Sequence, residues 1–457
     1  MSELLTDCHH ALNLGDMDLA GALLLEHMHE TPDDVDAWVM LTRFLIDGGK
    51  APFAYPIALA AAKRKKTWQT WMAVGATEAA LQLSKKALVS LKKALVLMPK
   101  NEPPWNRAML YRVMANASVQ GYAFKVAEQY AELSLEIEPH PQGHSALAFA
   151  KLHQRKWREG WYHYQFQLGH AMFRDKHDYN LPEWKGEPEA RVLVYGEQGL
   201  GDQIAYMSTF AGNLNQLNAH PKLKNLFART FPDVQVFGDQ FTPEFKHPVT
   251  ATHQTSMATA MQWATMERRD GYLKTHRERE LMWAGLLASL GSQPKIGIAW
   301  TGGMQNSDGW RTRRLGLQQL KPLLEEPYQF ISLQYKDYAS EIGEFYRDTG
   351  IKIHDFPWGT QTDDYEETAA LVNCLDAIVC VPTTAYHLAG ALGKPAMVLV
   401  HDQPHFHEGL EGDCPWWQSV EFFRRPQLGT ERAIEAVIDR LQKLFSGVSR
   451  IESAEHF

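Results

Sequence analysis

The sequence predicts a helical-repeat domain followed by an α/β region that consists of two parallel-sheet halves. Three observations lead to this fold class. Tryptophans recur at a near-constant spacing in the first third, short apolar runs alternate with amphipathic segments from Arg191 onward, and a Gly/Pro segment at residues 291–294 separates two groups of these runs. The expected domains are the repeats with their linker over residues 1–180, one α/β half over 181–292, and a second half over 293–457.

Composition narrows the class of protein. The chain has 457 residues with 45% hydrophobic content, which is enough to bury several cores. Its formal charge of −8 and its lack of a long basic run argue against a nucleic-acid partner. The four cysteines suit neither a disulfide framework nor a C-x-x-C site. With no basic N-terminal start and no apolar stretch near the roughly 20 residues of a membrane span, we expect a cytoplasmic protein without a membrane-spanning segment.

The first third carries a repeat. Trp38, Trp71 and Trp105 are spaced by 33 and 34 residues, and Pro32 and Pro99 each stand six residues before a tryptophan. This period is typical of tetratricopeptide repeats. We expect these tryptophans in the core, because each recurs where a neighbouring helix has to be covered.

Helix positions within the repeats follow from apolar spacing. Residues 87–98 carry apolar side chains at three- and four-residue steps, and a second helix is expected over Lys125–Glu138, each ending at a proline. The array serves either as a packed support or as a groove for a partner or acceptor peptide. One helix holds a basic stretch, which is explained as a solvated face and is assigned no site: Lys85, Lys86, Lys92 and Lys93.

The α/β region begins with the strand Arg191–Tyr195, a glycine loop, and a helix whose apolar face is expected to run as far as Leu217. The polar stretch Thr250–Glu280 is not assigned. Further strands are predicted at Val234–Phe237, Ile296–Trp300, Phe330–Gln334, Ile351–Phe356, Ala377–Val381 and Ala396–Val400. Ligands of such sheets bind beyond the carboxyl ends of the strands, so the loops there are the places to expect a site.

The first of these loops, Gly196–Asp202, contains three glycines that let the backbone approach a ligand. Asp202 stands at the start of the following helix, either as a helix N-cap or as a functional carboxylate. The loop lacks the G-x-G-x-x-G pattern, and no acidic residue closes a second strand nearby, so a nicotinamide enzyme is disfavoured.

Two later loops could receive phosphates. The segment Thr301–Arg314 combines glycines with three arginines, which could clamp phosphate oxygens or form an exposed basic loop, and Lys336 is a further candidate cation. In Val381–Pro395, two threonines open a helix whose N–H groups could seat a diphosphate, although a plain N-cap by Thr383 also accounts for them.

A histidine-rich segment follows the last predicted strand. Its imidazoles could line a sugar or acceptor pocket or form an ordinary loop, and a metal site is disfavoured because no cysteine completes a zinc spacing. The segment contains His401, His405 and His407.

Four motifs together resemble one family: Glu197–Asp202, Ile296–Gly302, Ser332–Gln334 and His387–Pro395. They are similar to bacterial tetratricopeptide-repeat glycosyltransferases whose catalytic part is like the lipopolysaccharide heptosyltransferases, that is, glycosyltransferase family 9-like. The stretch Gly160–Trp184 matches the junction that these proteins place between repeats and catalytic part.

The resemblance implies a GT-B fold with two Rossmann-like halves, the nucleotide sugar on the C-terminal half and the acceptor near the N-terminal half, with no metal or other cofactor. Asp202 would be the general base of an inverting transfer. The resemblance and the loops above assign the donor or diphosphate site to Gly199, Gly201, Thr301, Arg311, Arg313, Arg314, Gln334, Lys336, Thr383, Thr384 and His387. The acceptor or sugar pocket is assigned to Glu197, Gln198, Gln203, His401 and His405.

The expected function is therefore transfer of a sugar from a nucleotide sugar to a protein or glycan acceptor recruited by the repeats, in a chain that is compatible with a homo-oligomer. The nucleotide, the sugar and the acceptor stay open. Pro382 stands where many family members have Asp, so a non-catalytic repeat adaptor with a degenerate nucleotide-binding domain is the alternative. A heptose-adding enzyme of lipopolysaccharide assembly is disfavoured, because repeats favour a polypeptide partner.

Overall fold

The structure is a computed structural model that describes residues 3–170, 174–242, 244–303 and 313–446. The chain divides into two compact units, Met1–Gln167 and Leu168–Phe457, here called the repeat unit and the sheet unit. Within the described ranges, no helix is both long and apolar enough to cross a membrane.

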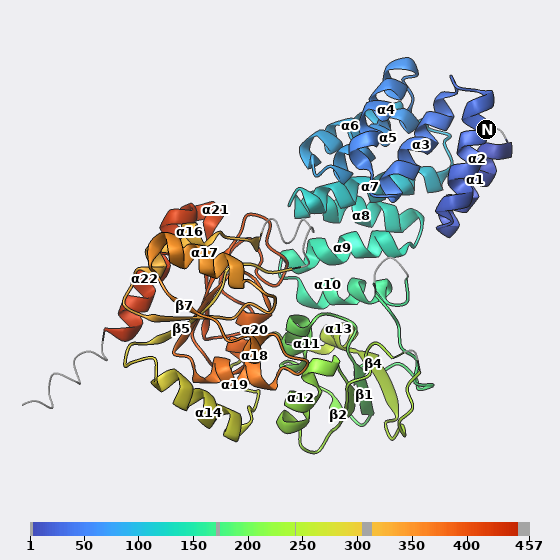
Figure 1. The fold of residues 1–457 in the computed structure, drawn as a ribbon. Coiled ribbons are helices and arrows are strands. Elements are labelled where there is room, and N and C mark those ends of the chain that lie inside the picture. Colours follow the sequence, from blue (N-terminus) through green and yellow to red (C-terminus); the bar gives the residue numbers. More distant parts are fainter. Residues whose placement is uncertain (1–2, 171–173, 243, 304–312, 447–457) are drawn as a thin grey trace, which may run out of the picture. The chain divides into compact units, whose positions relative to one another are not determined.

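The repeat unit is a TPR-like stack of helical hairpins, as predicted (Figure 1). Its helices are α1 (Glu3–Leu14), α2 (Met17–Glu30), α3 (Val35–Asp47), α4 (Ala51–Arg64), α5 (Trp68–Ala80), α6 (Ser84–Leu97), α7 (Pro104–Gln120), α8 (Phe124–Ile137), α9 (Pro141–His153) and α10 (Trp157–Tyr164). Consecutive helices pack as pairs, and the first helices of successive hairpins also pack on one another, α3 on α5, α5 on α7, and α7 on α9. The two helices predicted at residues 87–98 and 125–138 are confirmed as α6 and α8.

Small side chains let these helices approach closely. A Cβ on Gly75 of α5 would lie 2.5 Å from Cγ of Leu91 on α6, so glycine is needed at that contact. The core between α5, α6 and α7 is otherwise formed by alanine, leucine and methionine, including Ala87, Leu91 and Met114, together with Trp68.

The expectation that the periodic tryptophans lie in the core is wrong for Trp105 and holds only in part for Trp71, which is half-buried and packs against two core clusters. Trp105 is 61% exposed in the first turn of α7, whose buried positions begin at Ala108. Trp71 is half-buried and lines a surface pocket, and Trp38 donates from Nε1 to the Pro32 carbonyl at 3.0 Å. The tryptophan buried among the alanine, leucine and methionine side chains of this core is Trp68, three residues before Trp71 on α5.

The sheet unit contains two parallel sheets. The first sheet has the strand order β3-β2-β1-β4 and the second sheet the order β10-β9-β8-β5-β6-β7. The strands are β1 (Arg191–Tyr195), β2 (Asn213–Asn218), β3 (Gln235–Phe237), β4 (His253–Ser256), β5 (Lys295–Ala299), β6 (Gln329–Ser332), β7 (Ile353–His354), β8 (Ala377–Cys380), β9 (Ala396–Val400) and β10 (Val420–Arg424). All of the predicted strands appear within this set, and Lys295 follows directly on the predicted linker.

The helix predicted after the first strand is too long. The helix α11 (Leu200–Met207) ends early, and Leu214 and Leu217 belong to β2 instead. The strands β2, β4 and β10 were not predicted. Polar residues of β2 and β4 are buried because they are hydrogen-bonded: Gln254, for example, accepts from the Tyr179 backbone N–H at 2.7 Å.

Helices cover both faces of the second sheet (Figure 1). One face packs on α16, α17 and α22 through leucine, isoleucine and phenylalanine side chains, while α20 lies on β8 and β9 from the other side. The helices after α11 are α12 (Lys224–Thr230), α13 (Met257–Ala260), α14 (Arg277–Ala288), α16 (Leu317–Leu324), α17 (Ala339–Thr349), α18 (Pro357–Thr360), α19 (Glu366–Cys374), α20 (Thr384–Ala391), α21 (Arg425–Leu428) and α22 (Thr430–Phe445).

The two sheets of this unit are joined through helices. The main contact is α11 against α20, and α14 packs on α19. Two polar links add to it: Arg229 of α12 lies 2.6 Å from Glu366 of α19, and the Lys222 ammonium donates to the Thr362 carbonyl at 2.6 Å. Since α11 and α20 each follow the carboxyl end of a strand, this packing brings loops of both sheets to one region.

We predict that Gly390→Ala destabilises the sheet unit. The added Cβ would lie 2.2 Å from Cγ of the buried Trp417, and overpacking of this kind costs about 1–3 kcal/mol. A lower thermal unfolding midpoint checks this. The control is Gly343→Ala in α17, where a Cβ meets nothing within 4 Å, so stability should rise by roughly 0.5–1 kcal/mol. Equal melting of Gly390→Ala and the wild type would contradict the contact.

Candidate functional site

The glycine loop after β1 leads directly into the contact with α20. Gly199 is the N-cap residue of α11 and makes no side-chain cap, and Gly201 lies in the first turn. A Cβ on Gly201 would lie 3.1 Å from Cδ2 of His387 and 3.4 Å from Cα of Thr384, both on α20. Glycine therefore lets the starts of the two helices meet.

Asp202 is not the N-cap of α11, because Gly199 holds that position. Its Oδ1 lies 3.0 Å from Nε2 of His407, which belongs to the loop after β9. The Asp202 side chain is 30% exposed, whereas that of His407 is 4% exposed. The result is a carboxylate with one oxygen held by a buried imidazole and with access to solvent, in the first turn of a helix, where the dipole favours negative charge.

Aromatic rings hold the imidazole of His407. Its ring centroid lies 4.5 Å from that of Phe406, 4.9 Å from Trp416 and 5.8 Å from Tyr206. Its Nδ1 is buried without a hydrogen-bond partner among the described residues. The sequence offered His407 only as one member of a histidine cluster, and its pairing with Asp202 depends on the packing of the two sheets.

His387 is fixed in one tautomer. Its Nδ1 accepts from Nε1 of Trp417 at 3.2 Å, so a neutral ring carries its proton on Nε2. Burial, together with the nearby His407 and Arg313, holds the pKa of His387 well below its usual value. His387 is therefore neutral near pH 7.

His401, which directly follows β9, is a second buried histidine that is neutral near pH 7. Burial lowers its pKa to about 3, and the guanidinium groups of Arg313 and Arg425 contribute to the shift. Its Nδ1 accepts from the Gln403 backbone N–H at 3.0 Å, so the proton lies on Nε2. Nε2 is buried and has no partner in the described part of the chain, as is also true of Nε of Arg313. Two donors near each other thus lack an acceptor, and an anionic oxygen would supply one.

The three arginines predicted to bind phosphate do not share one environment in the described part of the chain. Arg311 lies outside the described residues. Arg313 lies close enough to His387 and His401 to lower the pKa of both, whereas Arg314 is exposed and its Nη2 is 3.4 Å from Oε2 of Glu341. Sequence reasoning missed Arg425, which comes from α21.

Gln334 and Thr301 are linked to each other. With its amide oxygen turned toward the Thr301 N–H, Gln334 forms two hydrogen bonds to the Thr301 backbone, at 3.1 and 3.2 Å, and so ties the ends of β5 and β6 together. The ammonium group of Lys336 lies over the ring of the neighbouring Tyr335, with Nζ 5.3 Å from the ring centroid.

The threonines that open α20 have distinct positions. Thr383 is the N-cap, and its Oγ1 accepts from the Ala385 N–H at 3.2 Å, so the capping role expected as the plain alternative is present. Thr384 lies in the first turn beside Gly201. A Cβ on Gly302 would lie 2.3 Å from Cγ2 of Thr383, so the loop after β5 also runs close to this helix start.

Glu197 forms an ion pair inside the protein. Its Oε1 lies 2.7 Å from Nη1 of Arg174, and it accepts from the Ala258 N–H at 3.2 Å. Both charged side chains are almost completely buried, and burial raises the pKa of Glu197 while Arg174 opposes the rise. Breaking such a pair is costly, so Glu197 braces the loop from within.

Gln203 and Gln198 also stabilise the loop. The Gln203 amide is fully buried and donates to the Gln198 carbonyl at 2.8 Å and to Oε1 of Gln240 at 2.7 Å. Of the residues assigned to the acceptor side, His405 has its ring tilted against that of Phe406, with centroids 4.0 Å apart, while its backbone N–H donates to Glu408.

One further arginine shapes the histidine loop. Arg424, at the end of β10, donates to three carbonyl groups of this loop, those of Glu408, Gly409 and Gly412, at 2.6–2.9 Å. Across the described ranges, no group of three or more His, Cys, Asp or Glu side chains is placed to hold a metal ion.

Comparisons with known proteins give partial likenesses. No family model matches the chain. Protein FlbA of Caulobacter vibrioides is 27% identical over 302 residues, which are 59% of this chain, and the chain spans about half (50%) of the length of that relative.

Solved structures resemble about a third of the chain. TTC0263, a TPR protein of Thermus thermophilus, is 22% identical and covers 35% of this chain and 86% of its own, with a TM-score of 0.32. PilF of Pseudomonas aeruginosa is 16% identical over 36% of this chain and 72% of its own, with a TM-score of 0.30.

We predict that His401 weakens folding at acidic pH. The pKa of His401 lies at about 3 in the folded protein against an ordinary 6.5, so between these values the unfolded chain binds a proton that the folded chain does not. The free energy of unfolding therefore decreases as the pH is lowered from 6.5 toward 3. From pH 6.5 to pH 4.5, His401→Gln should lose about 2 kcal/mol less than the wild type in denaturant unfolding. His29→Gln, at an exposed position, is the control. An unchanged pH dependence in His401→Gln would contradict the prediction.

Proposed function

We propose that the sheet unit is a GT-B-type glycosyltransferase that moves a sugar from a nucleotide sugar to a protein or glycan acceptor, with inversion and without a metal, and that the repeat unit recruits the acceptor. The observation that carries the proposal is the Asp202–His407 pair at 3.0 Å, at the region where strand ends of both sheets meet. The second sheet supports it, because its strand order is that of doubly wound nucleotide-binding sheets.

In the proposed reaction, Asp202 accepts the proton of the acceptor hydroxyl. The hydroxyl oxygen forms a bond to the anomeric carbon on the face opposite the leaving group. The bond from that carbon to the diphosphate oxygen breaks, its electron pair leaves with the nucleoside diphosphate, and the configuration inverts. Asp202 suits this role because it is partly exposed and lies in the first turn of a helix.

His407 is a positioning residue in this scheme. Its Nε2 holds one oxygen of Asp202, and the surrounding rings restrict the imidazole to one orientation. A carboxylate fixed in this way keeps its remaining basic lone pairs directed, which reduces the entropy lost on reaching the transition state.

The leaving diphosphate needs compensating charge and hydrogen bonds. Arg313 and Arg425 lie near His401, and the N–H of His401 Nε2 is a buried donor without an acceptor among the described residues. Guanidinium groups and a directed N–H are the groups that stabilise a diphosphate without a metal. The assignment of Lys336, Gln334 and Arg314 to the donor site stays a prediction.

A second candidate function is a repeat adaptor whose sheet unit binds a nucleotide without transfer. It is favoured by Pro382, which offers no carboxylate where many of the enzymes that the motifs resemble have Asp, and by the capping bond of Thr383. In this alternative the sheet unit still binds an anion near Arg313 and His401, but Asp202 does not act as a general base.

We predict that Asp202→Asn abolishes transfer while the protein still folds. Release of nucleoside diphosphate from a panel of nucleotide sugars, in the presence of protein and glycan acceptors, should fall by about 100- to 10,000-fold, the usual contribution of a general base. The control is Asp233→Asn, which changes an exposed carboxylate between α12 and β3. Turnover by Asp202→Asn at the wild-type rate would exclude Asp202 as the base.

We also predict that nucleoside diphosphates raise the thermal unfolding midpoint, and that Arg313→Ala and His401→Ala reduce this shift. Binding to the folded state alone stabilises it by RT ln(1 + [L]/Kd), about 2.7 kcal/mol at a hundredfold excess over Kd. The matched control is Arg347→Ala, at an exposed site in the last turn of α17. A shift without turnover of any donor would favour the adaptor, and no shift with any nucleoside diphosphate would contradict both functions.

A further inference from the structure

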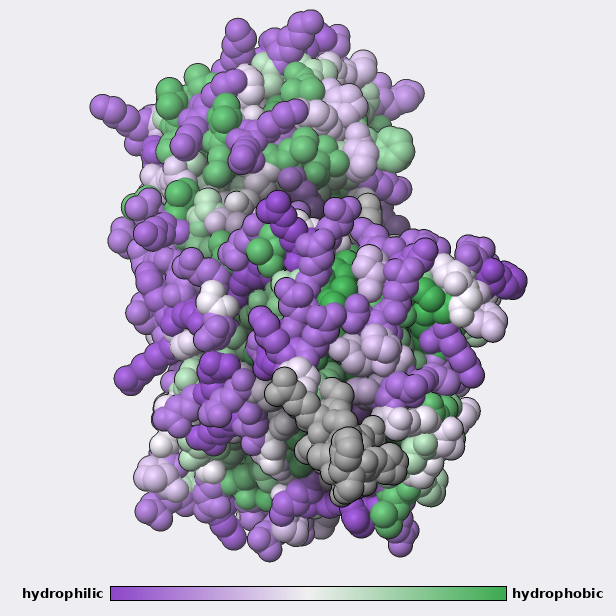
Figure 2. Space-filling model, turned by 90° about the vertical axis from the view of Figure 1, so that its left-hand side faces the viewer, coloured by the Kyte–Doolittle hydropathy of each residue, from purple (hydrophilic) through white to green (hydrophobic). Residues whose placement is uncertain are grey.

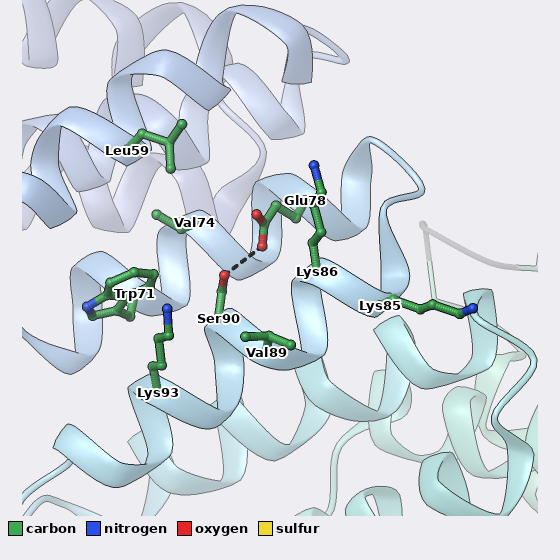
Figure 3. Close-up of a pocket in the computed structure, with 9 residues that line it drawn as sticks. All are labelled: Leu59, Trp71, Val74, Glu78, Lys85, Lys86, Val89, Ser90 and Lys93. Atoms are coloured by element: carbon green, nitrogen blue, oxygen red, sulfur yellow. Dashed lines mark hydrogen bonds between the residues drawn. The ribbon is translucent and has the colours of Figure 1, made fainter.

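A pocket on the repeat unit belongs to neither proposed function. It lies between α4 and α6, with α5 as its floor, and has a volume of about 410 Å³ (Figure 3). It is lined by Leu59, Trp71, Val74, Glu78, Lys85, Lys86, Val89, Ser90 and Lys93. The hairpins account for the gap, since the first helices α3, α5 and α7 pack on one another, whereas α4 and α6 are not among the main packed pairs.

The rim of the pocket is basic. Lys85, Lys86 and Lys93 are exposed, and none forms an ion pair with a carboxylate in the described part of the chain. Lys93 Nζ lies 4.2 Å from the ring centroid of Trp71, which fixes that ammonium at the pocket edge. In a protein of net charge −8, a helix with four lysines and no acidic residue is a local concentration of positive charge.

The interior of the pocket is apolar apart from one satisfied carboxylate. Leu59 and Val89 are 42% and 56% exposed on opposite walls, above Val74. Glu78 is buried in the floor, where its two oxygens accept from Ser90 Oγ at 2.7 Å and from the Tyr55 hydroxyl at 3.2 Å. Since these hydroxyls engage Glu78, the lysines remain available to an external partner.

We propose that this pocket binds an acidic segment of a partner protein, which seats an apolar side chain between Leu59 and Val89 and places carboxylates beside Lys85, Lys86 and Lys93. The volume suits a side chain or two, and the rim supplies the complementary charge.

Two features favour a protein segment over a lipid surface. The site is concave, and a bilayer does not fill a pocket whose floor is a carboxylate. On the face that Figure 2 shows, apolar side chains in the upper part of the view lie among hydrophilic ones. On α6, exposed Lys85, Val89, Lys92 and Val96 alternate along one side, a pattern that an acidic amphipathic helix complements. The proposal holds whether or not the sheet unit transfers sugar.

The test uses the full chain and a defined probe, a fluorescein-labelled helical peptide of about 16 residues with leucine at every third or fourth position and glutamate between. Fluorescence anisotropy, without nucleotide sugar, should show binding that weakens with salt. The variant Lys85→Ala/Lys86→Ala/Lys93→Ala should bind at least about tenfold more weakly, which corresponds to about 1.4 kcal/mol. Val89→Ser should also weaken binding.

A matched variant separates the pocket from net charge. Lys100→Ala/Lys125→Ala/Lys185→Ala removes the same charge at exposed positions that neither line the pocket nor lie on the outer side of α6, and should stay within about twofold of the wild type. Circular dichroism checks that all variants fold. Equal weakening by both triple variants, equal binding of a peptide with lysine in place of glutamate, or tighter binding to phosphatidylserine vesicles than to the peptide would overturn the proposal.

Discussion

The close approach of α11 to α20 is the constraint on which the candidate site depends. Gly201 leaves room for Thr384 and His387, so the amino-terminal ends of two helices converge on one region. Each end contributes a partial positive charge, and Arg313 adds a full one nearby. Asp202 lies at this region, where it is partly exposed and has one oxygen held by His407.

The histidines and arginines of the site have separate functions. Burial keeps His387 and His401 neutral, and each has a backbone or indole N–H on Nδ1 that fixes its tautomer. Positive charge is therefore left to Arg313 and Arg425. A site of this kind offers an anion a permanent charge from the guanidinium groups and directional donors from the imidazoles.

Apolar strands were predictable from sequence, whereas polar strands and contacts between the sheets were not. The runs that became β1, β5, β8 and β9 are buried on both faces and read as continuous apolar segments. In β2, Gln216 is buried only because it bonds Gln235 and the Pro248 carbonyl, which sequence periodicity does not reveal. Asp202 and Arg313 could be proposed from their places after strands. His407 and Arg425 could not, because their roles arise from long-range packing.

The repeat unit shows the opposite error, in which a correct period led to a wrong placement. The spacing of the tryptophans identified the repeats, but the indole buried between α5, α6 and α7 is that of Trp68, while the periodic Trp71 is only half-buried against this core. Trp71 lines the pocket instead, and the ammonium group of Lys93 lies over its ring. Because the first helices α3, α5 and α7 pack on one another, α4 and α6 stay apart, and the pocket with its basic rim lies between them.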